Sequence, residues 1–389
     1  MSISRLRNGR GGIEALSADD AYLYDGPVLF STVGPLLDPR INFRRATPGW
    51  YLDAAGVLQQ ASIDVPRFAR HSLGTTGLLL EGGQTNQALW SRDLTNAAWV
   101  KASVNAALNQ TGVDNSPNSA SSITASGAAG TVKQTLVDAV SGARTFSVFI
   151  KRLVGSGVID LTLDNGTTWT PVTVTAGWTR VFVTQTLANP VFGIRINTSG
   201  DSVAIDFSQQ ERFGVMTSPI LTTTTAVLRA EDIALIDGIN FSEIYNLSAG
   251  SWYARWISDL VNISGVERNI LSVDDNTANE RFAHLHENGS ATARMTVTDG
   301  GVNQAALLSG VPTNGAIHKM GVSYAVNDFR ACLDGGAVGS DAAGSVPIVN
   351  QARLGGRFNS VTSHLYGHVL SVEYRRVISS NAELQAGTV

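Results

Sequence analysis

The feature that most constrains this chain is a rhythm of short alternating segments separated by turn residues. Between residues 91 and 235, runs rich in Val, Ile, Phe and Thr follow one another with Gly, Asn or Pro between them. This rhythm is typical of an antiparallel β-sandwich. Alternation of apolar and polar residues, as in Thr179–Thr186, predicts strands with one buried and one wet face. The strands predicted in this block are Val132–Val137, Arg144–Arg152, Val158–Leu163, Val172–Thr175, Thr179–Thr186, Val191–Ile196 and Val203–Ser208. Between them, Asn109–Gly130 is predicted as a long loop or a weak edge strand.

Residues 241–389 repeat the same pattern and predict a second sandwich. Its predicted strands are Ser251–Ile257, Asn269–Val273, Arg281–His286, Ala293–Val297, His318–Tyr324, Asp328–Leu333 and Leu365–Tyr374. Helix is expected only near residues 15–24 and at Ser380–Gln385, where Ser380 or Asn381 would be the N-cap. Because both blocks show the same pattern of short strands separated by turns, we expect an all-β protein.

The first 90 residues lack such a regular pattern. In residues 1–40, Pro27, Pro35 and Pro39 leave no room for a helix or a long strand, which predicts an extended arm that docks on another protein. A strand that pairs onto the following domain is an equal alternative. Residues 41–90 predict a connector rich in β-hairpins, with one hairpin over residues 50–58.

The predicted fold class is therefore all-β, with two consecutive antiparallel β-sandwich (jelly-roll) domains preceded by an extended N-terminal docking segment. The predicted division is an arm at residues 1–40, a connector at 41–90, a first sandwich at 91–240 and a second sandwich at 241–389.

Charge, cysteine content and hydropathy exclude several classes of protein. The net charge of −4 argues against a nucleic-acid partner bound through bulk electrostatics. The single cysteine, Cys332, excludes a disulfide framework. No apolar run is long enough to span a membrane, and no apolar segment follows the basic start, so we expect no membrane insertion and synthesis in a cytoplasm.

Catalytic chemistry finds little support in the sequence. A glycoside hydrolase on a jelly roll needs two facing carboxylates, often as Glu-x-Asp on one strand, and no glutamate here has Asp two places on. Gly200-Asp201-Ser202 is similar to the nucleophile block of some esterases, but no Asp-x-x-His follows, and a β-turn explains the triplet. We therefore expect no catalytic residues and no enzyme activity.

Metal sites are also poorly specified. His284 and His286 share one face of a predicted strand, but a zinc site needs at least three protein ligands and no third is defined. Asp274 and Asp275 could offer oxygens to calcium, but they lie where a hairpin turn is expected. Asp274, Asp275, His284 and His286 are therefore weak metal candidates, and we expect neither a metal nor another cofactor.

Aromatic side chains are better candidates for ligand binding. Most of the tryptophans are expected in the cores, because Trp is usually largely buried. Trp169 differs, since it stands in the polar turn Asp164-Asn-Gly-Thr-Thr-Trp-Thr-Pro171. We predict that Trp169 stacks on a sugar ring, with Asn165 and Thr168 as hydrogen-bonding neighbours.

Several motifs resemble a known group of proteins. The motifs are Arg45-Ala-Thr47, Tyr51-Leu-Asp53-Ala-Ala-Gly56-Val-Leu58, Pro66-Arg67-Phe68, Gly77-Leu-Leu-Leu-Glu81, Thr85-Asn86, Trp90-Ser91-Arg-Asp93, Phe146-Ser-Val-Phe-Ile-Lys151, Gly177-Trp178-Thr-Arg180, Ser218-Pro219-Ile-Leu-Thr222 and Ala226-Val-Leu-Arg229-Ala-Glu-Asp232. The motifs from Arg45 to Asp93 resemble a segment of tailed-phage, prophage or gene-transfer-agent virion proteins of the tail fibre, receptor-binding or head-spike type. The motifs from Phe146 to Asp232 make the middle block similar to the carbohydrate-binding-module-like sandwich that usually follows this segment. The last block resembles concanavalin A-like (laminin-G-like) jelly rolls through Leu271–Asp275 and the segment 372–384.

The resemblance implies a non-enzymatic virion protein, a tail fibre or spike, that binds host surface polysaccharide during adsorption. Its other partners would be virion proteins that contact the N-terminal segment, and the chain would form a homo-oligomer, with a trimer favoured. It would be synthesised in the bacterial host cytoplasm and end in the virion. The alternative is a purely structural head-decoration, fibre or baseplate component that contacts only protein, and a polysaccharide depolymerase is a less favoured third class.

Overall fold

A computed structural model describes the chain except for residues 1–26, 33–35, 259, 261–266, 288–291 and 359–362. The described chain is built of β-strands with two short helices, α1 (Gly238–Ser242) and α2 (Asn381–Thr388). This confirms the all-β prediction, and Ser380 is the N-cap of α2, as expected. The expected helix near residues 15–24 lies outside the described residues. Neither described helix has the length and hydropathy needed to cross a bilayer.

The larger of two sandwiches, here called the large sandwich, has sheets of eight and seven strands. The eight strands are β1 (Val28–Ser31), β5 (Phe68–Arg70), β6 (Thr76–Leu80), β20 (Ala249–Ser258), β25 (Ile317–Ala325), β26 (Asp328–Leu333), β27 (Gly339–Asp341) and β29 (Gly367–Arg375). The seven are β2 (Asn42–Arg44), β19 (Ile233–Asp237), β21 (Arg268–Asp274), β22 (Arg281–Glu287), β23 (Ala293–Asp299), β24 (Val302–Gly310) and β28 (Gln351–Leu354). The strand orders are β27-β26-β25-β20-β29-β6-β5, with β1 also on β29, and β2-β19-β28-β21-β22-β23-β24.

The smaller one, called the inserted sandwich, has two five-stranded sheets. The first contains β9 (Val104–Gln110), β10 (Ala120–Ala125), β12 (Gly142–Val154), β15 (Thr179–Leu187) and β17 (Ser202–Glu211). The second contains β8 (Val100–Ala102), β11 (Gly130–Thr135), β13 (Ile159–Thr162), β14 (Thr170–Val172) and β16 (Val191–Ile196). Their orders are β15-β12-β17-β10-β9 and β14-β13-β16-β11-β8.

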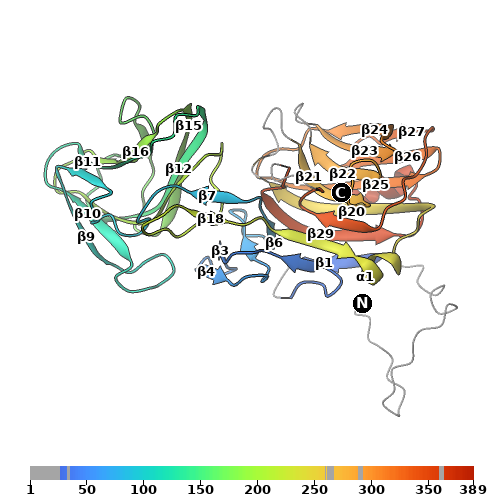
Figure 1. Ribbon diagram of the computed structural model, residues 1–389, viewed down its shortest axis with the longest axis horizontal. Helices are drawn as coiled ribbons and strands as arrows, with labels where there is room; N and C mark the ends of the chain where they lie inside the picture. Colours follow the sequence, from blue (N-terminus) through green and yellow to red (C-terminus); the bar gives the residue numbers. More distant parts are fainter. Residues whose placement is uncertain (1–26, 33–35, 259, 261–266, 288–291, 359–362) are drawn as a thin grey trace, which may run out of the picture.

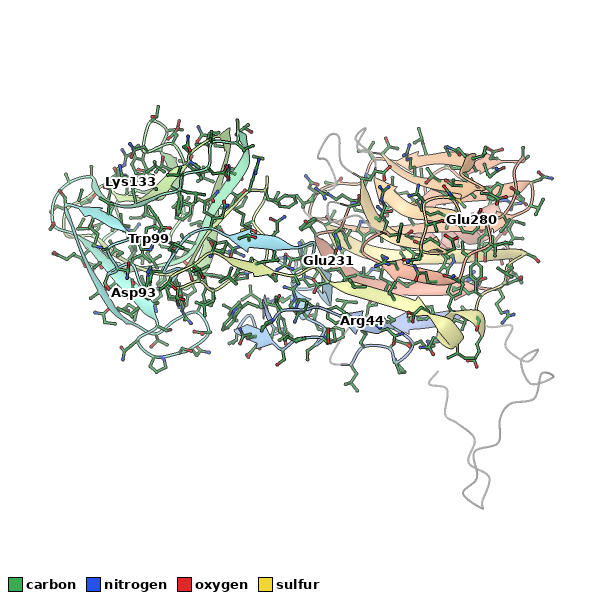
Figure 2. The ribbon with its side chains drawn as sticks, viewed as in Figure 1. Arg44, Asp93, Trp99, Lys133, Glu231 and Glu280 are labelled. Carbon is green, nitrogen blue, oxygen red and sulfur yellow. The ribbon has the colours of Figure 1, made fainter. Side chains whose placement is uncertain are left out.

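A two-stranded ribbon of β7 (Gln84–Asn86) and β18 (Val227–Arg229) joins the two sandwiches. Figure 1 shows the sandwiches as separate bodies with this ribbon between them. A hairpin of β3 (Gly49–Leu52) and β4 (Leu58–Ala61) lies beside the ribbon, and its turn is closed by Asp53 and Gly56 as the sequence predicts. In Figure 2, Glu231 lies at the junction and Trp99 lies inside the inserted sandwich.

Each sandwich has its own apolar core between its two sheets. In the inserted sandwich, Phe146 and Val148 of β12 meet Phe192 and Ile194 of β16. In the large sandwich, the core includes the fully buried Trp252 and Trp256 of β20. The alternation that predicted the strands places these side chains inward. Of the tryptophans, Trp99, Trp252 and Trp256 are buried in a core as expected, whereas Trp50, Trp90 and Trp178 are only partly buried against one.

The structure divides the chain differently from the predicted boundaries. Val28–Ser31 is not part of a free arm but pairs with β29, which is the alternative left open for the first 40 residues. Phe30 of this strand is fully buried and stacks on Trp252 at 6.2 Å between ring centroids. Strands β2, β5 and β6, from the predicted connector, and β19, from the predicted first sandwich, also belong to the large sandwich. Segments of three to five residues carry too little pattern to show that their hydrogen-bonding partners lie far along the chain.

A cluster of buried charges fixes the junction where the ribbon meets the large sandwich. Arg45, Arg67, Arg229, Glu81 and Asp232 have almost no exposed side chain. Asp232 binds Arg67 at 2.5 Å and Arg45 at 3.2 Å, while Glu81 binds Arg67 at 2.9 Å. Because an unpaired charge is costly away from water, the cluster holds the hairpin, β6 and the segment after β18 in one arrangement.

Candidate functional site

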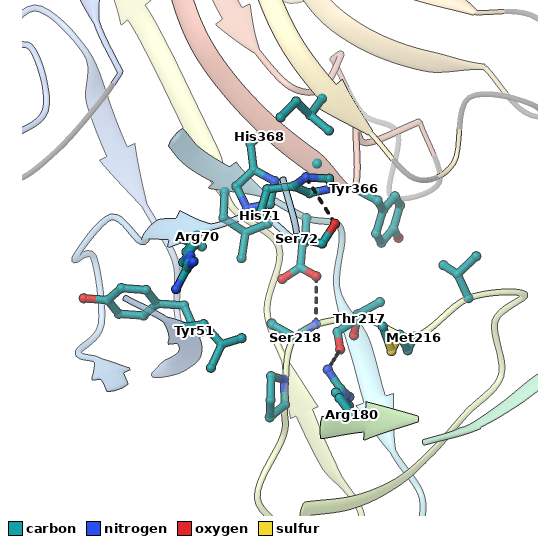
Figure 3. Close-up of a pocket in the computed structure, with 18 of the residues that line it drawn as sticks. Tyr51, Arg70, His71, Ser72, Arg180, Met216, Thr217, Ser218, Tyr366 and His368 are labelled. Carbon is teal, nitrogen blue, oxygen red and sulfur yellow. Dashed lines mark hydrogen bonds between the residues drawn. The ribbon is translucent and has the colours of Figure 1, made fainter. Parts of the chain in front are cut away.

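The candidate site is a cavity of about 700 Å³ between the inserted sandwich, the hairpin and the edge of the large sandwich (Figure 3). Its size lies in the range of small-molecule sites, which is roughly 300–1,000 Å³. Side chains from every one of these parts line it, among them Tyr51, Arg70, His71, Glu81, Phe149, Arg180, Phe182, Thr217, Ser218, Tyr366 and His368.

A β-bulge on β17 shapes the face of the inserted sandwich that lies toward the hairpin. Ser147 and Phe149 of β12 are two positions apart, but their partners on β17, Gln209 and Asp206, are three positions apart. β17 therefore contains one extra residue at this point, which is a β-bulge. The extra residue turns Phe207, at φ 44°, out of the sandwich core and against Trp50 of the hairpin. The bulge thereby gives the hairpin an apolar surface to pack on, and this packing forms one wall of the cavity.

Aromatic side chains line several sides of the cavity. Phe182 of β15 is 47% exposed, although it is a large apolar residue. Tyr51 of β3 is half-buried, and Tyr366 is buried and accepts a hydrogen bond from Gln84 at 3.3 Å. Rings that combine an apolar face with a polar edge suit ligands that have both apolar faces and hydroxyl groups.

Arg180 supplies the cavity with hydrogen-bond donors. Its Nη1 donates to the Thr217 carbonyl at 2.5 Å and its Nη2 donates to Ser147 Oγ at 3.0 Å. A guanidinium has five N–H groups, and Nε of Arg180 is buried without a hydrogen-bond partner among the described residues. Burial lowers the pKa of Arg180 to about 10, although Glu211 and Glu81 act in the opposite direction. The guanidinium is therefore desolvated and has donors to spare.

Glu81 is the carboxylate on the cavity wall. Burial raises its pKa, but Arg229 and Arg67 outweigh that effect and lower the pKa to about 2. The backbone N–H of Ser218 also donates to Glu81 Oε1 at 2.8 Å, as Figure 3 shows. A general acid needs a pKa near the working pH, so Glu81 serves as an ionised structural anchor.

The histidines His71 and His368 close the upper part of the cavity in Figure 3. Both are largely buried, and their rings meet edge to face at 5.4 Å between centroids. His71 follows β5 and His368 lies on β29, so this contact belongs to the large sandwich.

The structure places the predicted Trp169 on the loop that enters β14, away from the residues that line this cavity. Trp169 is half-buried, and the Arg195 guanidinium lies 4.4 Å from its ring centroid. Asn165 and Thr168 are exposed on the same loop: Asn165 accepts a hydrogen bond from Lys133, and the N–H of Thr168 donates to Asp164. The loop therefore brings the three predicted residues together, with one side of the Trp169 ring in contact with Arg195.

The metal candidates do not form a described cluster. Asp274 is fully buried and accepts hydrogen bonds from Ser272 and Gln351, and Asp275 closes the turn after β21 by accepting from Thr277. His284 and His286 lie on β22, and their side chains are outside the described part of the structure. Within the part that is described, no group of three or more His, Cys, Asp or Glu side chains could hold a metal ion.

The cavity residues were not singled out individually by sequence reasoning, but a signal for them was present. Tyr51, Glu81, Arg180 and Ser218 line the cavity and stand in the motifs that carry the resemblance, and so does Arg67, which binds Glu81 behind the cavity wall. Their separation in the sequence hides this meeting point, because only the pairing of β6 with β29 and the insertion of the smaller sandwich bring them together.

No family model and no curated protein matches the sequence. Solved structures match with low overall similarity. The carbohydrate-binding module CBM40 of a Ruminococcus gnavus IT-sialidase, bound to α2,3-sialyllactose, is 17% identical, and the match covers 36% of this chain and 82% of that one at a TM-score of 0.31. The CBM22 tandem of Paenibacillus barcinonensis Xyn10C is 10% identical. That match covers 76% of this chain and 97% of that one at a TM-score of 0.26. Mouse laminin α1 domains LG4-5 are also 10% identical. That match covers 76% of this chain and 88% of that one at a TM-score of 0.27.

Proposed function

We propose that this chain is a non-enzymatic glycan-binding protein of a tailed-phage virion, a fibre or spike, and that the cavity at the junction holds the glycan. The observation that carries the proposal is the cavity itself, where an exposed Phe182 and the ring of Tyr51 lie near the spare donors of Arg180. Sugars present apolar ring faces and many hydroxyl groups, so they need aromatic surfaces and hydrogen-bond donors together.

The non-enzymatic part of the proposal is supported by the state of Glu81. Hydrolysis of a glycosidic bond uses a pair of carboxyl groups, one of which must deliver a proton. Glu81 is held ionised by Arg67 and Arg229 and is bound to the backbone of Ser218. Its environment therefore favours a structural role over acid catalysis.

The virion part of the proposal is supported by the motifs. Their residues form the buried charge cluster and much of the cavity wall, so the features that resemble virion proteins also build the junction. In a homo-oligomer, with a trimer favoured, weak sites in several copies would combine through high effective concentration. Attachment to other virion proteins is proposed for the segment before β1, and the host surface polysaccharide is the proposed ligand.

The test compares variants of the full chain in binding to host cells and to purified surface polysaccharide. Phe182→Ala removes an exposed ring from the cavity, and by analogy with aromatic stacking on bases, at about 1–3 kcal/mol, affinity should fall roughly tenfold to hundredfold. Leu308→Ala, on β24 and 60% exposed, is the matched control and should bind normally.

Trp169→Ala tests the second proposed contact, with Asn165 and Thr168 beside it. A loss of affinity in this variant with normal binding by Phe182→Ala would move the glycan site to the β13–β14 loop. If the unchanged protein binds neither host cells nor any surface polysaccharide, the proposal is wrong. The alternative, a structural virion component that contacts only protein, then replaces it. Release of reducing ends from the polysaccharide would instead show a depolymerase.

A further inference from the structure

Two arginines that line the cavity form no ion pair with any residue that the structure describes. Arg180 donates to a carbonyl and a hydroxyl, and no carboxylate of the described chain lies within ion-pair distance of its guanidinium. Arg70, which is exposed, also has no ion pair within the part of the chain that the structure describes. Figure 3 shows Arg70 beside Tyr51 and Arg180 beside Thr217, so the two guanidinium groups come from separate walls.

The surroundings of Arg180 do not neutralise its charge by contact. Glu81 is used by Arg67 and Arg229, and the buried cluster as a whole has three arginines against two carboxylates. Glu211 is bound to Thr217, and burial raises the pKa of Glu211, which weakens it as a counter-ion. A desolvated guanidinium without a contacting anion gains most from a ligand that supplies one.

We infer that the ligand of this cavity is an acidic glycan, in which oxyanions of the glycan pair with Arg180 and with Arg70 while a sugar ring lies against Phe182. This inference rests on the proposed function and adds the chemical class of the sugar. A guanidinium binds a carboxylate or a phosphate through paired N–H···O bonds. Sugar carboxylates, as in uronic acids, and sugar phosphates are two sources of such an oxyanion, and the experiment separates them.

The first arm measures binding of the full chain to immobilised bacterial polysaccharides. The probes are capsular polysaccharides that contain uronic acids, the same polymers after chemical reduction of their carboxyl groups, a glycerol-phosphate teichoic acid, and dextran as the neutral reference. Reduction should weaken binding at least about tenfold, because a charge-assisted contact is lost. Binding should also weaken as NaCl rises, since salt screens exposed charges such as Arg70.

The second arm compares variants with a matched control. Arg180→Gln and Arg70→Gln should each lower the affinity for the acidic polymer by roughly tenfold or more, and should lower the affinity for its reduced form by a much smaller factor, because only neutral hydrogen bonds are lost there. Arg180→Lys keeps the charge but not the planar fork, so its loss should be smaller. Arg212→Gln, an exposed arginine outside the cavity, should bind as the unchanged protein does. If Arg180→Gln unfolds, as judged by its melting temperature, Arg70→Gln and Arg180→Lys decide.

Each outcome has a defined meaning. Preference for the uronic polymers assigns the oxyanion to a carboxylate, and preference for teichoic acid assigns it to a phosphate. Equal binding of native and reduced polymers, with unchanged affinity in the arginine variants but reduced affinity in Phe182→Ala, would overturn this inference and leave the proposed function standing. Binding to none of the probes, nor to host cells, would overturn both.

Discussion

Removing the charge of Asp232 should destabilise the large sandwich strongly. Asp232 is fully buried, and its carboxylate binds Arg67 at 2.5 Å, Arg45 at 3.2 Å and the backbone N–H of Glu81 at 2.9 Å. In Asp232→Asn the three arginines of the cluster would share the single carboxylate of Glu81. Loss of one partner from a buried ion pair costs about 3–5 kcal/mol.

Differential scanning calorimetry of the full chain measures this effect. For a unit of this size, 1 kcal/mol corresponds to about 2–4 °C, so the melting temperature of the large sandwich should fall by roughly 6–20 °C. Asp328→Asn is the matched control, because Asp328 binds Arg330 at 2.7 Å but its side chain is 36% exposed. An exposed pair contributes about 0–1 kcal/mol, so this variant should melt within a few degrees of the unchanged protein. Equal shifts in the two variants would refute the reasoning that burial makes the cluster critical.

Three further predictions test the fold and its pH dependence. Phe30→Ala should destabilise the large sandwich by about 3–5 kcal/mol in urea unfolding, whereas Leu29→Ala, 57% exposed on the same strand, should have little effect; equal effects would show that β1 is not packed as described. The pKa of Glu81 is lowered to about 2, below its value in the unfolded chain, so the stability that the ionised Glu81 contributes is complete above about pH 4.5 and is lost as the pH falls toward 2. The melting temperature of Glu81→Gln should therefore fall less steeply than that of the unchanged protein over this range. Equal slopes would contradict the lowered pKa of Glu81. Gly193→Ala should destabilise the inserted sandwich by about 1–3 kcal/mol, because the added Cβ would collide with the Val132 carbonyl oxygen. In the control Gly177→Ala, the added Cβ meets no atom closer than 4.0 Å. Hydrogen exchange in the inserted sandwich should be faster in Gly193→Ala than in Gly177→Ala.

Strands with a clear alternation were predictable within a few residues. The predicted Val191–Ile196 coincides with β16, and Thr179–Thr186 is one residue short of β15. In β15 the more buried and more exposed positions alternate over enough residues to define the face that packs inward, whereas β16 is buried along most of its length and is recognisable as a short apolar run between Pro190 and Asn197. The weakly patterned Asn109–Gly130 contains β10, whose Ala and Ser side chains give little hydrophobic contrast although they are paired on both sides.

The division into domains and the cavity could not be predicted in the same way. β1 and β5 have three or four residues each, and the residues that decide their place, such as Trp252 for Phe30, lie in other parts of the chain. The cavity depends on the same long-range pairings and on the bulge at Phe207, which reverses an otherwise regular alternation. Local sequence carries the hydrophobic period of a strand but not the identity of its distant partner.

The insertion of one sandwich into the other also sets an order for folding during synthesis. Val28 pairs with Tyr374, so the first described strand has no partner until almost the whole chain has left the ribosome. All strands of the inserted sandwich lie between residues 100 and 211 and are complete much earlier. Domains fold as units when their residues become available, so the inserted sandwich should form first. Until the large sandwich is complete, the segments that form β1, β2, β5 and β6 lack their partners in its sheets. Their unpaired backbone groups could then form β-sheet hydrogen bonds with a neighbouring copy of the growing chain.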